Sequence, residues 1–188
     1  MSRAEKLDFR KISVLLVDDN PHALELLSQI LGGYRVERNE VCASAEEARE
    51  RVAAKAFDII IVDAEMPNED GFSLTREIRR RSDQPNFTAP IILLSANTPL
   101  AKVTAARDAG ASAVIKKPVA PGVLLNRITW LARHSREFVQ TSTYIGPDRR
   151  FKQVPLPAEI SERRADALAL MASFDGAMSQ DDVNSLFG

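Results

Sequence analysis

Residues 12–21 read ISVLLVDDNP. The first six letters are apolar except for Ser13 and are bounded by polar residues, which is typical of a strand buried on both faces of a sheet. The proline that closes the stretch fits the first turn of a helix, and apolar residues recur at helical spacing over 23–31. The stretch therefore predicts a strand–helix unit with two carboxylates, Asp18 and Asp19, where the strand ends.

The same alternation of strand and helix recurs along the chain as far as residue 134. Further strands are predicted at 35–43, 59–62, 91–94 and 113–115, and further helices at 44–54, 72–81, 100–109 and 121–134. Five such units with short connections predict an α/β fold with helices on both faces of a parallel sheet. Right-handed crossovers then favour a doubly wound, five-stranded sheet of order 2-1-3-4-5, the flavodoxin-like arrangement.

The sequence predicts three parts. Residues 1–134 form the sheet domain, residues 135–157 form a linker with three prolines and little periodicity, and residues 158–188 form a helical C-terminal extension. That extension combines an amphipathic helix with a short docking peptide, and it is too small to build a core of its own. It also lacks the length and the basic face of a DNA-binding module.

Composition excludes several classes of protein. The chain has 188 residues, 45% of them apolar and 27% charged, with a net charge of −1. That charge balance gives no general attraction to nucleic acid or to an anionic membrane. No apolar run approaches the ~18 residues of a membrane helix, and the first residues lack a hydrophobic signal core. One cysteine and two histidines do not suit a Cys- or His-based metal centre. The expected location is the cytoplasm.

Polar residues that point to chemistry follow four of the predicted strands. Asp18 and Asp19 follow the first strand, Asp63 the third, Ser95 the fourth and Lys117 the fifth. In the predicted strand order these ends are adjacent and converge on one crevice. Three carboxylates at close range repel one another, and a divalent cation relieves that repulsion. An all-oxygen site of this size suits Mg²⁺.

These groups are suited to attack on phosphorus. Asp63 is the candidate nucleophile, because carboxylates can form aspartyl phosphates as covalent intermediates. Asp18 and Asp19 would hold the metal, Lys117 would neutralise charge, and Ser95 would donate a hydrogen bond to a phosphoryl oxygen. The set predicts a site that accepts a phosphoryl group.

Four segments carry a resemblance to a known family: VLLVDDNP (14–21), IIIVDAEMPNEDGF (59–72), LLSAN (93–97) and AGASAVIKKP (109–118). Over residues 10–134 the chain resembles the receiver domain of two-component response regulators.

The resemblance implies a role for each of the strand-end residues. Asp63 would be the phospho-acceptor and Ser95 the switch hydroxyl, while Lys117 would pair with the phosphorylated site. Asp18 and Asp19 would bind Mg²⁺ together with Asp63 and the backbone carbonyl of Glu65. The phosphoryl donor would be a sensor histidine kinase or a histidine phosphotransfer protein, and the only catalysis would be self-phosphorylation and slow autodephosphorylation.

Two positions depart from the family pattern. Val114 stands where the family usually has an aromatic switch residue, which puts the usual aromatic readout in question. Glu65 stands at a position that varies in the family. Its carboxylate either adds negative potential beside Asp63 or points to solvent, and the sequence leaves both open.

The end of the chain carries a second resemblance. Residues 175–188 resemble the amino-terminal peptide of the flagellar motor switch protein, to which phosphorylated chemotaxis regulators bind. A downstream target connected with flagella or chemotaxis is therefore one expectation. The tail is also expected to dock on the exposed side of the 121–134 helix, on its own receiver or on a neighbouring one. The residues expected to meet are Val123, Arg127 and Trp130 on that helix and Met171, Phe174, Leu186 and Phe187 on the tail.

The sequence thus predicts a phospho-acceptor response regulator that signals through protein contacts, with no DNA-binding output domain. A phosphorelay shuttle, which passes phosphoryl groups between histidine-containing proteins, is the alternative. A hydrolase of the haloacid dehalogenase type ranks last, because it would need a second aspartate where this chain has Glu65.

Overall fold

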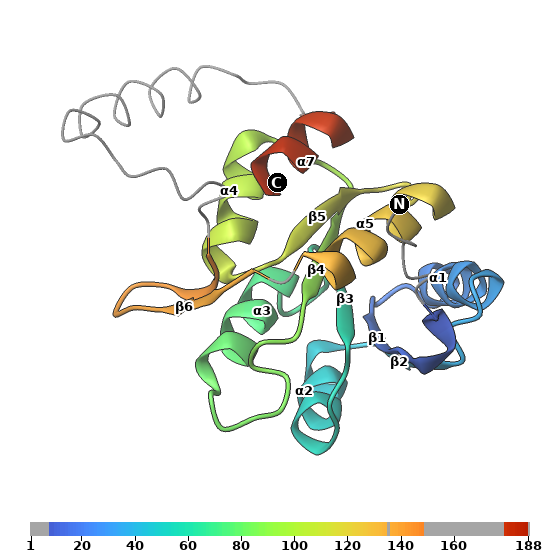
Figure 1. Ribbon diagram of the computed structural model, residues 1–188, viewed down its shortest axis with the longest axis horizontal. Coiled ribbons are helices and arrows are strands. Elements are labelled where there is room, and N and C mark those ends of the chain that lie inside the picture. The colour runs from blue at the N-terminus through green and yellow to red at the C-terminus, as the bar shows by residue number, and fades with distance from the viewer. Residues whose placement is uncertain (1–7, 135, 149–178, 188) are drawn as a thin grey trace, which may run out of the picture.

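The computed structural model describes residues 8–134, 136–148 and 179–187. Five parallel strands form a sheet of order β2-β1-β3-β4-β5, and helices cover both of its faces (Figure 1). The strands are β1 (Ser13–Val17), β2 (Arg38–Cys42), β3 (Ile59–Asp63), β4 (Ile91–Ser95) and β5 (Ala113–Lys116). The helices of this unit are the short η1 (Phe9–Lys11), then α1 (Pro21–Gly33), α2 (Ala45–Ala54), α3 (Gly71–Arg80), α4 (Leu100–Ala109) and α5 (Pro121–Arg133). The predicted fold class and strand order are confirmed.

Alternate residues of each central strand pack into opposite layers of the core. Ile60 lies in a cluster with buried side chains of α2, α3 and α4. Its neighbour Ile61 lies in the other cluster, with those of α1 and α5. Both isoleucines are fully buried, because each face of the sheet is covered by helices. The unbroken apolar runs of the sequence follow from this double burial.

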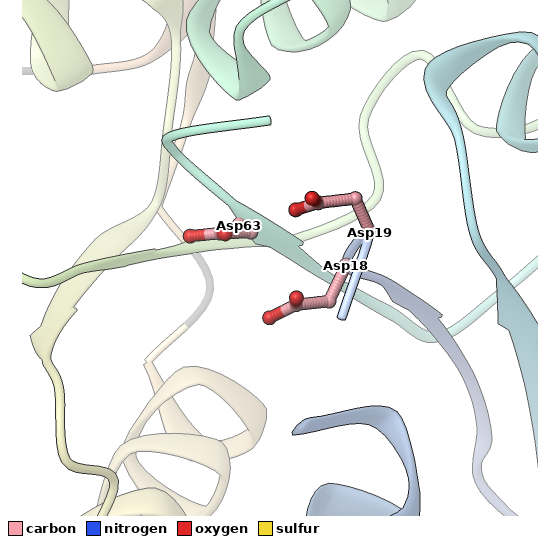
Figure 2. A group of neighbouring side chains, drawn as sticks. All are labelled: Asp18, Asp19 and Asp63. Atoms are coloured by element: carbon pink, nitrogen blue, oxygen red, sulfur yellow. The ribbon is translucent and has the colours of Figure 1, made fainter. Parts of the chain in front are cut away.

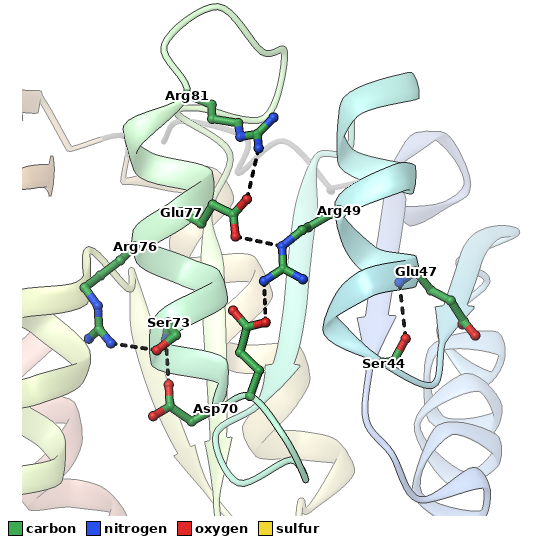
Figure 3. Close-up of polar contacts among 9 residues, drawn as sticks. Ser44, Glu47, Arg49, Asp70, Ser73, Arg76, Glu77 and Arg81 are labelled. Atoms are coloured by element: carbon green, nitrogen blue, oxygen red, sulfur yellow. Dashed lines mark hydrogen bonds and ion pairs between the residues drawn. The ribbon is translucent and has the colours of Figure 1, made fainter.

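Side-chain caps begin two of the helices that cover the α2–α4 side, as Figure 3 shows. Ser44 Oγ accepts a hydrogen bond of 3.2 Å from Glu47 N–H at the start of α2. Asp70 does the same for Ser73 N–H, at 2.6 Å, at the start of α3. Each cap satisfies a backbone donor that has no partner within its helix. The two helices are also joined by an ion pair of 2.7 Å between Arg49 and Glu77.

The structure differs from the predicted linker over residues 136–148. Here β6 (Phe138–Gln140) and β7 (Ile145–Pro147) form an antiparallel hairpin. The hairpin packs on the sheet domain: the Phe138 and Phe87 rings lie 4.7 Å apart, and Arg136 donates to Ser112 O at 2.6 Å. These long-range contacts stabilise strands of three residues, which are too short to produce a pattern in the sequence. Residues 149–157 of the predicted linker lie outside the described residues.

The tail contributes one described helix, α7 (Gln180–Phe187), which lies against β5 (Figure 1). The predicted helix at 158–174, with Met171 and Phe174, lies outside the described residues, as do the side chains of Leu186 and Phe187. Among the helices in the described ranges, none has the length and hydropathy to cross a membrane.

Candidate functional site

Three aspartates meet at the carboxyl ends of β1 and β3, as Figure 2 shows. Carboxylate oxygens of Asp18, Asp19 and Asp63 all lie within 4.8 Å of one another. Asp18 and Asp63 are buried, with exposed fractions of 1% and 4%, whereas Asp19 is exposed. The cluster therefore has a desolvated inner side and one carboxylate open to solvent.

Lys117 approaches the cluster from the end of β5. Its Nζ lies 2.9 Å from Asp18 Oδ2 and 2.9 Å from Asp63 Oδ1. Burial raises the pKa of Asp63, and the Lys117 ammonium offsets only part of that rise. Burial alone would lower the pKa of Lys117, but its contacts with the Asp63 and Asp18 carboxylates outweigh burial, and the pKa is raised. Lys117 is therefore a charged partner for both buried carboxylates at neutral pH.

Asp63 Oδ1 distinguishes this cluster from a surface group of acids. The atom is buried and accepts no directed hydrogen bond from the residues that the structure describes, although Lys117 lies nearby as an ion pair. Asp18 is better satisfied, because its Oδ1 accepts from Asn20 N–H at 2.9 Å. Three clustered carboxylates, one of them with a buried oxygen that accepts no directed hydrogen bond, fit a hard divalent cation such as Mg²⁺.

A close backbone approach fixes the position of Asp63. Gly71, the first residue of α3, donates from its N–H to Ala64 O at 3.1 Å. A Cβ atom at Gly71 would lie 2.2 Å from Asp63 O, which is far inside van der Waals contact. Only glycine therefore allows α3 to begin directly against the end of β3.

Ser95 and Glu65 interact on the β4 side of the cluster. Ser95 is 2% exposed, and its Oγ has two acceptors in reach: Glu65 Oε1 at 2.9 Å and Asn97 O at 2.7 Å. Glu65 also accepts from Ala96 N–H at 3.2 Å and pairs with Lys102. Burial opposes ionisation of Glu65, but these donors outweigh it and lower the pKa of the carboxyl. The Glu65 carboxylate is thus held at the end of β4 and the start of α4, while its side chain stays 37% exposed to solvent.

The predicted partner-binding residues of α5 are placed unequally. Arg127 is buried at 8% exposure, whereas Val123 and Trp130 are half-buried. Trp130 stacks on His134 with ring centroids 4.9 Å apart. Arg127 contacts α7, through a hydrogen bond to Asn184.

Gln180 makes the hydrogen bonds that join α7 to β5. Gln180 Oε1 accepts from Lys116 N–H at 2.7 Å, and Gln180 Nε2 donates to Val114 O at 3.1 Å. Its amide thus pairs with the free edge of β5 as a neighbouring strand would. Val183 is fully buried in the same apolar cluster as Val114. No local pattern marks Gln180, because its partner is a strand edge distant in the sequence.

The chain is similar to known proteins in both sequence and structure. The response regulator receiver domain family matches residues 14–129. The chain is 39% identical over 111 residues to a protein-glutamate methylesterase/protein-glutamine glutaminase 1 of Syntrophus aciditrophicus (strain SB), covering 57% of this chain and 30% of that protein. It is 36% identical over 124 residues to the transcriptional regulatory protein GltR of Pseudomonas aeruginosa, covering 66% and 50%. The chemotaxis protein CheY4 of Vibrio cholerae has a similar structure, with a TM-score of 0.58, 30% identity, and coverage of 63% and 96%.

The chain spans about half or less of the length of these two curated relatives. The family match covers well over half of the chain and includes every strand of the parallel sheet except the first residue of β1. The chain therefore belongs to the response regulator receiver domain family.

Proposed function

We propose that this protein is a response regulator whose Asp63 accepts a phosphoryl group from the phosphohistidine of a sensor histidine kinase or histidine phosphotransfer protein. The observation that carries the proposal is the buried Asp63 Oδ1, which lacks a directed hydrogen bond and lies 2.9 Å from Lys117 Nζ. An Asp63 oxygen forms the new O–P bond while the N–P bond of the donor breaks, and the released imidazole regains its proton from solvent. Lys117 neutralises charge as the group arrives.

The same proposal includes a resident Mg²⁺. The side chains of Asp18, Asp19 and Asp63 would hold it, with the backbone carbonyl of Glu65 as a further ligand. When bound, the ion supplies positive charge against the phosphoryl oxygens. Asp18 has a second role, because it also holds Lys117 in place.

Asp19→Asn is expected to weaken Mg²⁺ binding by roughly tenfold or more, because it removes one ligand charge from a hard-cation site. Asp19 is exposed, so the fold should be unaffected. Calorimetric titration of the full chain with Mg²⁺ measures the change. The control is Asp83→Asn, which removes an exposed carboxylate from the loop before β4. Equal affinity in wild type and Asp19→Asn would place the metal elsewhere.

We infer that output passes through protein contacts on the surface that α7 covers, formed by the β5 edge and Arg127. Gln180 holds the β5 backbone at Val114 and Lys116, and Lys116 directly precedes Lys117. A phosphoryl group on Asp63 changes the charge that Lys117 faces, and we propose that this alters how firmly α7 is held. Release of α7 would then uncover the surface for a target, and exchange between two chains would let the tail dock on a neighbouring receiver.

Gln180→Ala is expected to speed hydrogen exchange of the Lys116 amide by about tenfold or more, because that amide loses its acceptor. Asp181→Ala is the matched control, since Asp181 is exposed on the same helix. Exchange of the full chain, followed by NMR, measures both. Unchanged protection of Lys116 in Gln180→Ala would contradict docking of α7 on this strand.

The direction of phosphoryl flow separates this proposal from the phosphorelay alternative. The full chain is labelled on Asp63 with acetyl phosphate and then mixed with histidine phosphotransfer domains. A terminal regulator keeps the label until it hydrolyses, and the proposal predicts that outcome. Rapid movement of label to histidine would instead identify a shuttle.

We propose a flagellar or chemotaxis-related protein as one downstream target. The support for it is the resemblance of residues 175–188 to the motor switch peptide.

A further inference from the structure

Glu65 lies in the loop after β3 and reaches across to the end of β4 and the start of α4. Its Oε1 lies 2.9 Å from Ser95 Oγ, its Oε2 accepts from Ala96 N–H at 3.2 Å, and the carboxylate also pairs with Lys102. The Glu65 side chain is 37% exposed, so it reaches these donors from the solvent side. The carboxylate is therefore firmly held, yet it can leave without crossing the core.

The donors that hold Glu65 border the acceptor carboxylate. Asp63 is the last residue of β3, Ser95 is the last residue of the neighbouring β4, and Ala96 follows it. A phosphoryl group on Asp63 brings ionised oxygens to this edge of the sheet, and such oxygens form strong hydrogen bonds with available donors. On the β5 side, the Lys117 ammonium is the donor for these oxygens. On the β4 side, Ser95 Oγ and Ala96 N–H are the donors to which Glu65 is bonded.

We propose that Glu65 is a resident anion, which occupies the β4-side donors until a phosphoryl group on Asp63 displaces it. The inference rests on the proposed function, because it requires Asp63 to be the acceptor. Two anions that compete for the same donors at short range also repel each other. Glu65 therefore opposes phosphoryl acceptance and sets how strongly the site binds the incoming group.

After the exchange, both Ser95 and Glu65 still have a hydrogen-bond or ion-pair partner. The proton of Ser95 Oγ stays on the hydroxyl, and the hydrogen bond that it donates to Glu65 turns to the phosphoryl oxygen. Asn97 O at 2.7 Å is a further acceptor for this hydroxyl. Glu65 keeps Lys102, which belongs to the first turn of α4. The exchange thus links occupancy of the acceptor site to a charge pair between the β3–α3 loop and α4.

The test compares Glu65→Ala with Glu69→Ala in the full chain. Both remove a carboxylate from the same loop, but Glu69 pairs with Arg49 on α2 and does not touch Ser95 or Ala96 in the described contacts. The probe is beryllofluoride with Mg²⁺, a phosphoryl analogue, titrated by NMR. Glu65→Ala is expected to bind it about tenfold more tightly than wild type, since a charged competitor for two donors is removed. Glu69→Ala should stay within about twofold of wild type.

The Ala96 amide is a second readout, measured first without Mg²⁺ or beryllofluoride and then with both. In the unliganded protein, Glu65→Ala should shift the Ala96 amide resonance and speed its hydrogen exchange, because the amide loses its acceptor. After beryllofluoride binds, the Ala96 resonances of wild type and Glu65→Ala should coincide, since both then have the same acceptor. These two measurements also show that the variant remains folded.

The results distinguish a failure of the Glu65 exchange from a failure of Asp63 as the acceptor. Unchanged or weaker beryllofluoride binding in Glu65→Ala, or an equal gain in Glu69→Ala, would overturn the resident-anion role while leaving Asp63 as the acceptor. Failure of every variant, wild type included, to bind beryllofluoride would instead contradict the proposed function. Asp63→Asn serves as the non-binding reference.

Discussion

Asp63→Asn is expected to reduce phosphoryl acceptance by roughly a thousandfold or more, to the background of the assay, because an amide oxygen cannot replace a carboxylate as nucleophile. Asparagine preserves the size of the side chain, so the buried cluster should stay packed. Transfer of label from a phosphorylated histidine domain to the full chain measures the loss. Asp83→Asn, which alters an exposed aspartate, should accept as wild type does. Substantial acceptance by Asp63→Asn would mean that another residue is the acceptor.

The same substitution is expected to stabilise the fold at neutral pH. Because burial raises the pKa of Asp63, the folded protein holds that proton more tightly than the unfolded chain does. The stability contributed by Asp63 is therefore full below the ordinary aspartate pKa of 3.8 and is lost as pH rises from there through the higher folded-state pKa. Asp63→Asn lacks this loss. Urea unfolding at acidic and neutral pH should show the variant gaining stability over wild type as pH rises.

Arg79→Ala is expected to lower the free energy of unfolding by roughly 4 kcal/mol, an unusually large loss for one substitution. Arg79 is 1% exposed, and burial lowers its pKa to about 9, which leaves it charged at neutral pH. Its guanidinium donates to four carbonyls: Gly110 O at 3.0 Å, Asn86 O at 3.5 Å, Phe87 O at 2.7 Å and Ala89 O at 2.7 Å. Alanine would leave these acceptors without their donor and open a cavity.

The neighbouring residue provides the control for that measurement. Arg80 is exposed on the same helix, so Arg80→Ala should change the free energy of unfolding by no more than about 0.5 kcal/mol. Urea denaturation of the full chain followed by circular dichroism compares the two variants. If both lose the same small amount of stability, Arg79 does not organise this part of the fold.

The sheet and its strand ends could be predicted because their information is local. Runs such as 59–62 are apolar at every residue, because both faces of the strand are covered by helices. The polar residue that follows each run marks the end of the strand. Once the strand order is given, Asp18, Asp63 and Lys117 must converge. Their spacing in the structure follows from the parallel register rather than from any further signal in the sequence.

The parts that the sequence did not reveal depend on partners far along the chain. Asn86, in the irregular stretch at 82–90, is fully buried: it accepts from Phe57 N–H at 2.8 Å and donates to Val52 O at 2.7 Å. The hairpin at 136–148 is held in the same way, by contacts with α3 and with the end of α4. Arg127 was expected on an outer flank, but α7 covers it. Helical periodicity identifies the face of a helix, not what packs on that face.

The position of the phosphoryl group on the chain tests whether Asp63 is the acceptor. The full chain is phosphorylated with acetyl phosphate and Mg²⁺, the acyl phosphate is trapped by borohydride reduction, and the peptides are mapped by mass spectrometry. We expect a single modified residue, Asp63. Modification of Asp18, Asp19 or any other residue in place of Asp63 would contradict it.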